Sequence, residues 1–150
     1  MEVVIVAGIL STVSLAFLGT FAVISKFHEK NLRVIKAGLL AEEGIEALRI
    51  IKERDFSALA TMAQTGPTTP RYLAVSTTTW NVSGTPEVID NLFYRYFVVR
   101  PAYRTASSDP TETSTGNTLD PNTVYVDVHV EWQWRNSTTT NIYKAFMTNL

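Results

Sequence analysis

The chain contains no cysteine, which excludes disulfide frameworks and cysteine-based zinc sites. Neither sign of charge is in excess, because 13 lysines and arginines stand against 14 aspartates and glutamates. Bulk binding to a polyanion is therefore not expected. The sequence also lacks a glycine-rich phosphate loop and a nucleophile elbow. We expect no enzymatic activity, no cofactor and no metal centre.

Charge is also absent from one long stretch, the 23 residues from Val3 to Ser25. As an α-helix this stretch would be roughly 35 Å long, whereas the hydrocarbon core of a membrane is about 30 Å thick. A cleavable signal peptide is less favoured, because the stretch is too long and no basic residue precedes it. We therefore divide the chain into a hydrophobic helix over residues 1–25, which anchors it in a membrane, and a globular head over residues 26–150.

Small side chains recur every four residues on the hydrophobic helix: Gly8, Thr12, Ala16 and Thr20, with Gly19 beside them. Such side chains let helix backbones approach closely in lipid or in a dry bundle. The helix would then pack against copies of itself or against a partner helix. The alternative is that small residues are simply common in membrane helices. Glu2 opens the apolar run, so it either sits at the headgroup level or pairs with a cation.

Beyond Lys26 apolar residues recur at threes and fours on an otherwise charged segment, which predicts an amphipathic helix. The stripe consists of Leu32, Ile35, Leu39, Ile45, Leu48, Ile51, Phe56 and Leu59. Gly66 and Pro67 would end a single helix of about 60 residues that runs from near Glu2 to about Met62. The stripe is expected to cover a sheet, and Gly38 and Gly44 are expected to mark bends.

Period-two alternation predicts strands in the rest of the chain. It is clearest from Val124 to Arg135, and a turn at 136–138 would lead into a partner strand over Thr139–Thr148. Leu92–Arg100 and Tyr72–Val82 are predicted as two further strands. The predicted fold class is α+β: one very long N-terminal helix whose C-terminal half packs on a small antiparallel sheet of three or four strands. One sheet face would lie in the core and the other in water.

The segment Thr105–Thr123 is rich in serine and threonine and is predicted to be a long surface loop. Its oxygen-bearing side chains suit calcium, but their spacing fits no EF-hand, so a solvated or glycosylated loop is favoured. These side chains are Asp109, Glu112, Asn117, Asp120 and Asn122. Asn81 and Asn136 lie in N-glycosylation sequons, which matter only outside the cell.

Two further clusters were weighed as sites. Aromatic and basic residues alternate between Phe93 and Arg104, which would suit stacking on single-stranded DNA, although a strand packed on both faces explains the same pattern. DNA binding is thus a minor expectation. Asp127, His129 and Glu131 share one strand face, but a solvated face is favoured over a metal site.

Together these features resemble the type IV pilins and the related pseudopilins, in particular the type-II-secretion-like group. The resemblance covers the whole chain. It is most specific at Glu2–Ala7, where a carboxylate opens an uncharged helix, and Ala41–Lys52 and Met147–Leu150 add to it.

The resemblance implies a structural subunit of an extracellular filament at the cell surface. The subunit would wait in the cytoplasmic membrane, be handled by a prepilin peptidase and the pilus assembly machinery, and polymerise into a helical homo-oligomer. Glu2 would neutralise the terminal amine of the adjacent subunit, and Gly19 would permit local unwinding of the helix. The alternatives are a minor pilin or pseudopilin of a secretion or DNA-uptake system, and a single-pass membrane-anchored binding module.

Two features depart from the family pattern. Glu2 is the second residue here and the fifth in mature pilins, so we expect a basic leader and three mature residues ahead of Met1. The second departure is charge, because the positive-inside rule would place the head in the cytoplasm. The cations responsible follow the apolar run: Lys26, Lys30, Arg33 and Lys36. A basic leader upstream would resolve the conflict.

Overall fold

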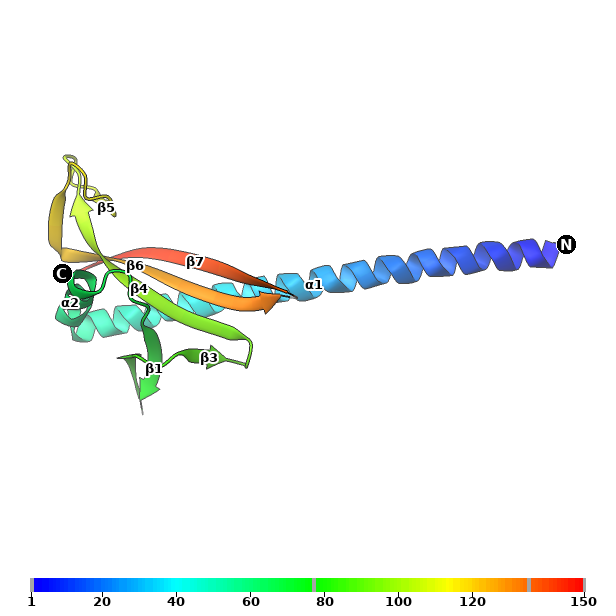
Figure 1. Ribbon diagram of the computed structural model, residues 1–150, viewed down its shortest axis with the longest axis horizontal. Coiled ribbons are helices and arrows are strands. Elements are labelled where there is room, and N and C mark those ends of the chain that lie inside the picture. Colours follow the sequence, from blue (N-terminus) through cyan, green and yellow to red (C-terminus); the bar gives the residue numbers. More distant parts are fainter. Residues whose placement is uncertain (1, 77, 135, 150) are drawn as a thin grey trace. The chain divides into compact units, whose positions relative to one another are not determined.

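The computed structural model describes residues 2–76, 78–134 and 136–149. Met1, Thr77, Arg135 and Leu150 lie outside the described residues, and with them the predicted strand end at Arg135 and the last residue of the pilin resemblance. The elements in Figure 1 are α1 (Glu2–Arg54), α2 (Phe56–Thr65), β1 (Tyr72–Ser76), β2 (Thr79–Ser83), β3 (Glu87–Ile89), β4 (Phe93–Arg104), β5 (Pro110–Thr111), β6 (Thr118–Trp134) and β7 (Ser137–Thr148).

The predicted α+β class with a long apolar N-terminal helix is confirmed. The main sheet is antiparallel and has the strand order β3-β4-β6-β7, with β5 paired to the far end of β4. A separate two-stranded sheet consists of β1 and β2. The chain divides into two compact units, residues 1–36 and 37–150, and the division falls inside α1.

The core of the second unit lies between the two helices and one face of the main sheet. The alternation on β6 places Val124, Val126, Val128, Val130 and Trp132 in this core, as predicted. The last part of α1 and the face of α2 that carries Leu59 and Ala63 pack against them. Among the described residues, the core begins at Ala37, and none of residues 2–36 belongs to it.

The helix face that packs on the sheet coincides only in part with the predicted stripe, of which Leu48, Ile51 and Leu59 are buried in the core. Small residues dominate it, and Leu39, a member of the stripe, is 61% exposed. A Cβ atom on Gly44 would lie 3.0 Å from Val128 Cγ1, and one on Gly38 would lie 2.9 Å from the Tyr143 hydroxyl. These glycines therefore allow close approach of helix and sheet. The buried residues of α1 are Ala37, Ala41, Gly44, Ala47, Leu48 and Ile51.

The single helix predicted to reach Met62 is interrupted at Asp55. The Asp55 side chain accepts hydrogen bonds from the Ala58 amide at 3.1 Å and from the Ser57 hydroxyl at 2.7 Å, and so caps the start of α2. An aspartate at this position offers the backbone an alternative to a continuous helix. The hydrogen bond from Ser57, supported by the Ala58 amide, lowers the pKa of Asp55.

Two strand predictions also need correction. Tyr72–Val82 is a hairpin of β1 and β2, and not one strand; the apolar residues change phase between Leu73 and Val75 on one side and Trp80 and Val82 on the other. Thr105–Thr123 is not a plain loop, because β4 extends to Arg104 and pairs with β6 from Thr118 onward. A register shift at Pro101/Ala102 precedes this extension, which we call the arm (residues 102–120).

Candidate assembly segment and charged clusters of the head

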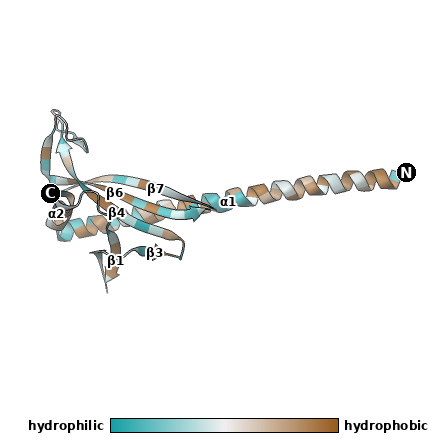
Figure 2. Ribbon diagram, viewed as in Figure 1, coloured by the Kyte–Doolittle hydropathy of each residue, from teal (hydrophilic) through white to brown (hydrophobic). Residues whose placement is uncertain are grey.

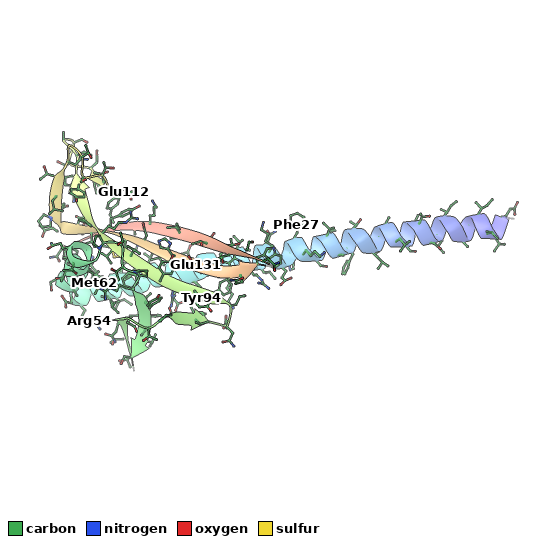
Figure 3. All side chains as sticks on the ribbon, viewed as in Figure 1. Phe27, Arg54, Met62, Tyr94, Glu112 and Glu131 are labelled. Carbon is green, nitrogen blue, oxygen red and sulfur yellow. The ribbon has the colours of Figure 1, made fainter. Side chains whose placement is uncertain are left out.

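The hydrophobic part of α1 is not covered by any part of the chain that the structure describes. Every residue from Glu2 to Asn31 is exposed, including Val3 at 81% and Phe17 at 71%. Figure 2 shows hydrophobic residues along this part of the helix, and Figure 3 shows their side chains projecting from it. The helix is long and apolar enough to cross a membrane.

Four of the five hydroxyl groups between Val3 and Ser25 are satisfied inside the helix. Each donates a hydrogen bond to the carbonyl four residues earlier: Ser11 to Ala7, Thr12 to Gly8, Ser14 to Leu10 and Thr20 to Ala16, at 2.6 to 3.0 Å. Such bonds remove donors that would otherwise be left unpaired in an apolar environment. These four hydroxyl groups can therefore be buried in lipid or in a helix bundle without losing their hydrogen bonds.

The predicted assembly residues Gly8, Thr12, Ala16 and Gly19 all lie on this exposed segment. A Cβ atom on Gly8 or on Gly19 would meet nothing within 4 Å, so nothing inside one subunit requires a glycine at either position. Glu2 is exposed in the first turn of α1, where a carboxylate interacts favourably with the helix dipole. The roles of these residues toward a second chain stay predictions.

A buried arginine cluster, which the sequence reading missed, ties the sheet to α1. Arg95 is only 1% exposed and forms a two-pronged pair with Glu87 on β3, with Nε–Oε2 and Nη2–Oε1 distances of 2.9 and 3.0 Å. Its Nη1 donates to the Leu40 carbonyl at 3.0 Å and to Glu43 at 3.1 Å. The signal was present: Arg95 occupies a core-facing position in the alternation from Phe93 to Val99.

The basic-aromatic stretch between Phe93 and Arg104 does not form the stacking surface considered for DNA. Phe93, Arg95 and Phe97 are buried in the core. Arg100 and Arg104 form ion pairs with Asp127 and Asp120. The structure therefore engages these five residues within the head.

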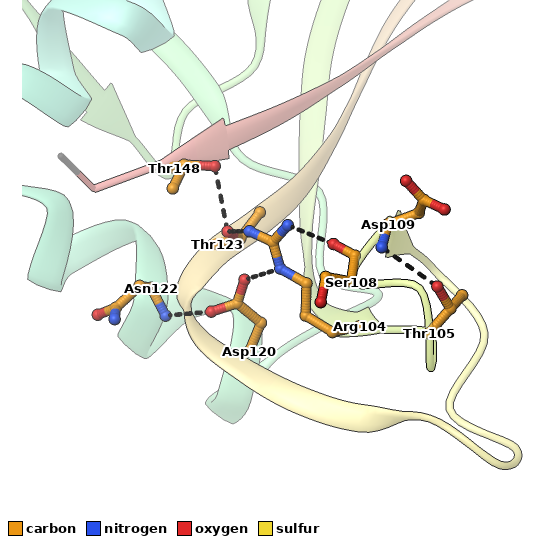
Figure 4. A network of polar contacts seen from close by, with 8 residues as sticks. All are labelled: Arg104, Thr105, Ser108, Asp109, Asp120, Asn122, Thr123 and Thr148. Atoms are coloured by element: carbon orange, nitrogen blue, oxygen red, sulfur yellow. Dashed lines mark hydrogen bonds and ion pairs between the residues drawn. The ribbon is translucent and has the colours of Figure 1, made fainter.

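Arg104 fastens the base of the arm, as Figure 4 shows. Its Nε lies 2.7 Å from Asp120, Nη1 donates to the Ser108 carbonyl at 2.9 Å, and Nη2 donates to the Thr123 hydroxyl at 3.2 Å. Thr123 in turn contacts the Thr148 hydroxyl near the end of β7. Burial raises the pKa of Asp120, but hydrogen bonds from Thr123 and Arg104 outweigh it and lower that pKa overall.

This pairing commits one of the considered calcium ligands, Asp120, to an arginine. Among the described residues, no group of three or more histidine, aspartate or glutamate side chains could hold a metal ion. His129, one of the three residues considered together, stacks on Tyr96 with ring centroids 4.6 Å apart. Glu131 instead accepts a hydrogen bond from the Tyr96 hydroxyl at 2.9 Å.

The sheet face opposite the core is less exposed to solvent than predicted, because Tyr125 and Asp127 on β6 are buried. Burial, followed by the hydrogen bond to Glu131, raises the pKa of Tyr96 to about 12. Burial also lowers the pKa of His129, and the nearby cations Arg100 and Lys144 act in the same direction. We call the sheet face opposite the core, which carries Tyr96, Tyr125, Asp127 and His129, the outer face.

An ion-pair cluster closes one end of the outer face. Arg100 contacts Asp127 and lies 3.7 Å from Glu112 of the arm, and Lys144 lies 3.8 Å from Glu112. The Tyr125 ring lies close to both cations, 5.2 Å from Arg100 Cζ and 5.6 Å from Lys144 Nζ. The cluster joins β4, β6 and β7 to the arm.

The two sequons differ in accessibility. The Asn81 side chain is half-buried and accepts a hydrogen bond from Arg54 at 2.9 Å. Asn136 is exposed in the turn between β6 and β7. Asn136 is therefore the better acceptor of the two.

Comparisons with known proteins identify no relative of this chain. No family model, no curated protein and no solved structure matches the chain.

Proposed function

We propose that this chain is a structural subunit of a type IV pilus-like extracellular filament, held in the cytoplasmic membrane by its hydrophobic helix before assembly. One observation carries the proposal. The 23 uncharged residues from Val3 to Ser25 are exposed, whereas the core of the head is complete without them. The N-terminal sequence Glu2–Ala7 and its resemblance to pilins support the proposal further.

The exposed segment cannot remain in water. Thirteen large apolar side chains between Val3 and Ile24 are exposed. Because burying each such side chain contributes about 1.5–3 kcal/mol, the segment favours an apolar environment by on the order of 20 kcal/mol or more. The single chain supplies no such environment, so lipid or other copies of the chain must supply it.

Lipid alone does not account for every feature of the segment. Small residues on one face suit close contact between helices. Glu2 would be costly to bury alone, and a terminal amine of the neighbouring subunit would compensate its charge. Together these features favour a helix bundle, formed when subunits leave the membrane and their N-terminal helices become the filament core.

A single-pass anchored binding module is the second candidate, and the basic residues beginning at Lys26 favour it. Such a module would stay in the membrane fraction as a monomer. A minor pilin or pseudopilin would instead occur in trace amounts in sheared material.

The first experiment is to shear the cell surface, image the released material by electron microscopy, and identify its main chain and terminal residue by mass spectrometry. We expect thin filaments in which this chain dominates and Glu2 is fifth from a processed terminus. Recovery of the chain only from the membrane fraction would contradict the filament proposal.

Glu2→Ala tests the assigned role of the carboxylate. We expect loss or strong slowing of filament assembly with an unchanged head, because the incoming terminal amine loses its partner. Glu53→Ala removes an exposed carboxylate from the same helix and serves as the matched control. A normal filament yield from Glu2→Ala would contradict the role of Glu2 in pairing with the incoming terminal amine.

A further inference from the structure

The outer face carries a groove that the proposed filament role does not use. Neighbouring positions on β4, β6 and β7 form rows across the sheet, such as Val98, Asp127 and Lys144. The groove over these rows has a volume of about 320 Å³. This is at the small end of ligand sites, which are usually about 300–1,000 Å³. Its main lining residues are Pro67, Val98, Arg100, Asp127, His129 and Ile142.

Two buried polar atoms of groove-lining residues have no partner. Asp127 is 3% exposed, and while its Oδ2 contacts Arg100 Nη2, its Oδ1 has no hydrogen bond. Arg100 Nε is also buried and unpaired. A buried polar group without a partner typically costs about 1–3 kcal/mol. Less than 1 Å² of each atom is accessible, so pairing them with a ligand or water in the groove requires a small movement of the Arg100 side chain, which is 37% exposed.

The charges around the groove select the kind of ligand. Arg100 and Lys144 are balanced by Asp127 and Glu112, so two positive charges meet two negative ones. A charged ligand would break this balance. A hydroxyl group both donates and accepts at one oxygen atom, so it can satisfy Asp127 Oδ1 and Arg100 Nε while remaining neutral.

The remaining lining favours a ligand with both hydroxyl groups and C–H surface. Val98, Ile142 and Pro67 contribute aliphatic surface beside the polar pair. Ile142 is about half exposed and therefore accessible from solvent. We propose that this groove binds a neutral sugar unit, with a hydroxyl group bridging Asp127 and Arg100 and the C–H face of the ring against Ile142 and Val98.

Saturation-transfer NMR on the full chain tests this site. The chain is held in micelles of a phosphocholine detergent, which carries no sugar, and the probes are the methyl glycosides of glucose, galactose and mannose. We expect transfer to at least one glycoside and none to methyl phosphate, a charged probe whose methyl protons can be observed. Absence of transfer to all three glycosides would mean that water alone fills the groove, and would overturn the proposal.

Two variants locate the binding. Asp127→Asn should weaken binding about tenfold, because the acceptor loses its charge and the hydrogen bond to it becomes a weaker neutral one. Since that change alters a buried ion pair, Ile142→Trp provides a second test in which a larger side chain on a half-exposed position fills the groove. Val75→Trp, on the exposed side of β1, is the matched control. Binding that survives Ile142→Trp would place the sugar elsewhere and overturn the proposal.

Discussion

The two parts of α1 solve the burial problem in different ways. Residues 37–54 bury alanine, glycine and a few larger residues against a sheet of the same chain. Residues 2–25 expose large apolar side chains around the helix and are not covered by any part of the chain that the structure describes. The contrast teaches that side-chain size follows the partner: close approach to a sheet requires small residues, while lipid and helix bundles accept large ones.

The largest effect is expected when the head alone is destabilised, which tests whether the head and the hydrophobic segment are stable independently of each other. Arg95→Met should destabilise the head by about 3 kcal/mol, because the partly buried Glu87 carboxylate and the Leu40 carbonyl both lose their partner. Unfolding in urea, followed by tryptophan fluorescence in micelles, measures the loss. Arg49→Met, which removes an exposed arginine, is the control. Equal midpoints for the two variants would contradict the assigned weight of the buried cluster.

That experiment should leave the hydrophobic segment unaffected. We expect Arg95→Met to remain in the membrane fraction, because none of the described residues 2–36 belongs to the head core. Loss of membrane retention with loss of the head would show that the two units depend on each other.

Gly44 and Gly8 lie in the two different parts of α1, and only Gly44 is in close contact with other residues of the chain. Gly44→Ala should destabilise the head by about 1–3 kcal/mol, because the new Cβ would crowd the buried Val128 side chain at 3.0 Å. Gly8→Ala should not destabilise the single subunit, since its Cβ meets nothing and alanine favours the helix. Thermal unfolding measures the first effect and helix content by circular dichroism the second.

The same glycine pair also reports on assembly. If Gly8 lies where helices meet in a filament, Gly8→Ala will lower the filament yield while the subunit stays intact. An unchanged yield would remove Gly8 from the assembly surface and leave it as an ordinary residue of a membrane helix.

Periodicity predicted the elements better than it predicted their partners. Alternation on β6 identified the core face correctly, and the charge-free run marked the exposed part of α1. The hydrophobic stripe identified Leu48 and Ile51 on the buried face of α1, but not the alanines and the glycine between them, because small residues carry little hydrophobic signal. Arg95 was missed because partners far along the chain, Glu87 and Leu40, decide whether an arginine can be buried. The Asp127 groove likewise depends on three strands and the arm.

The stability of the head should depend on pH through His129, which is partly buried on the outer face. Because burial lowers the pKa of His129 in the folded state, the unfolded chain binds the proton more readily. Stability is therefore full above the unfolded pKa of about 6.5 and declines as pH falls below it. Thermal unfolding between pH 7.5 and 5.5 measures this decline. His129→Gln should flatten it; an identical decline in the variant would exclude His129 as its source.

The smallest effect on stability is expected from removing an exposed charge on α1. The same variant tests whether that charge contacts another copy of the chain in an assembly. Glu46 and Arg49 form an exposed pair three residues apart, so Glu46→Gln should cost a single subunit only about 0.2–0.5 kcal/mol in urea unfolding. Screening by salt should erase even this difference. If filament yield nevertheless falls strongly in the same variant, the pair must contact a neighbouring subunit, and the second part of α1 would then use one face for its own sheet and the other for assembly.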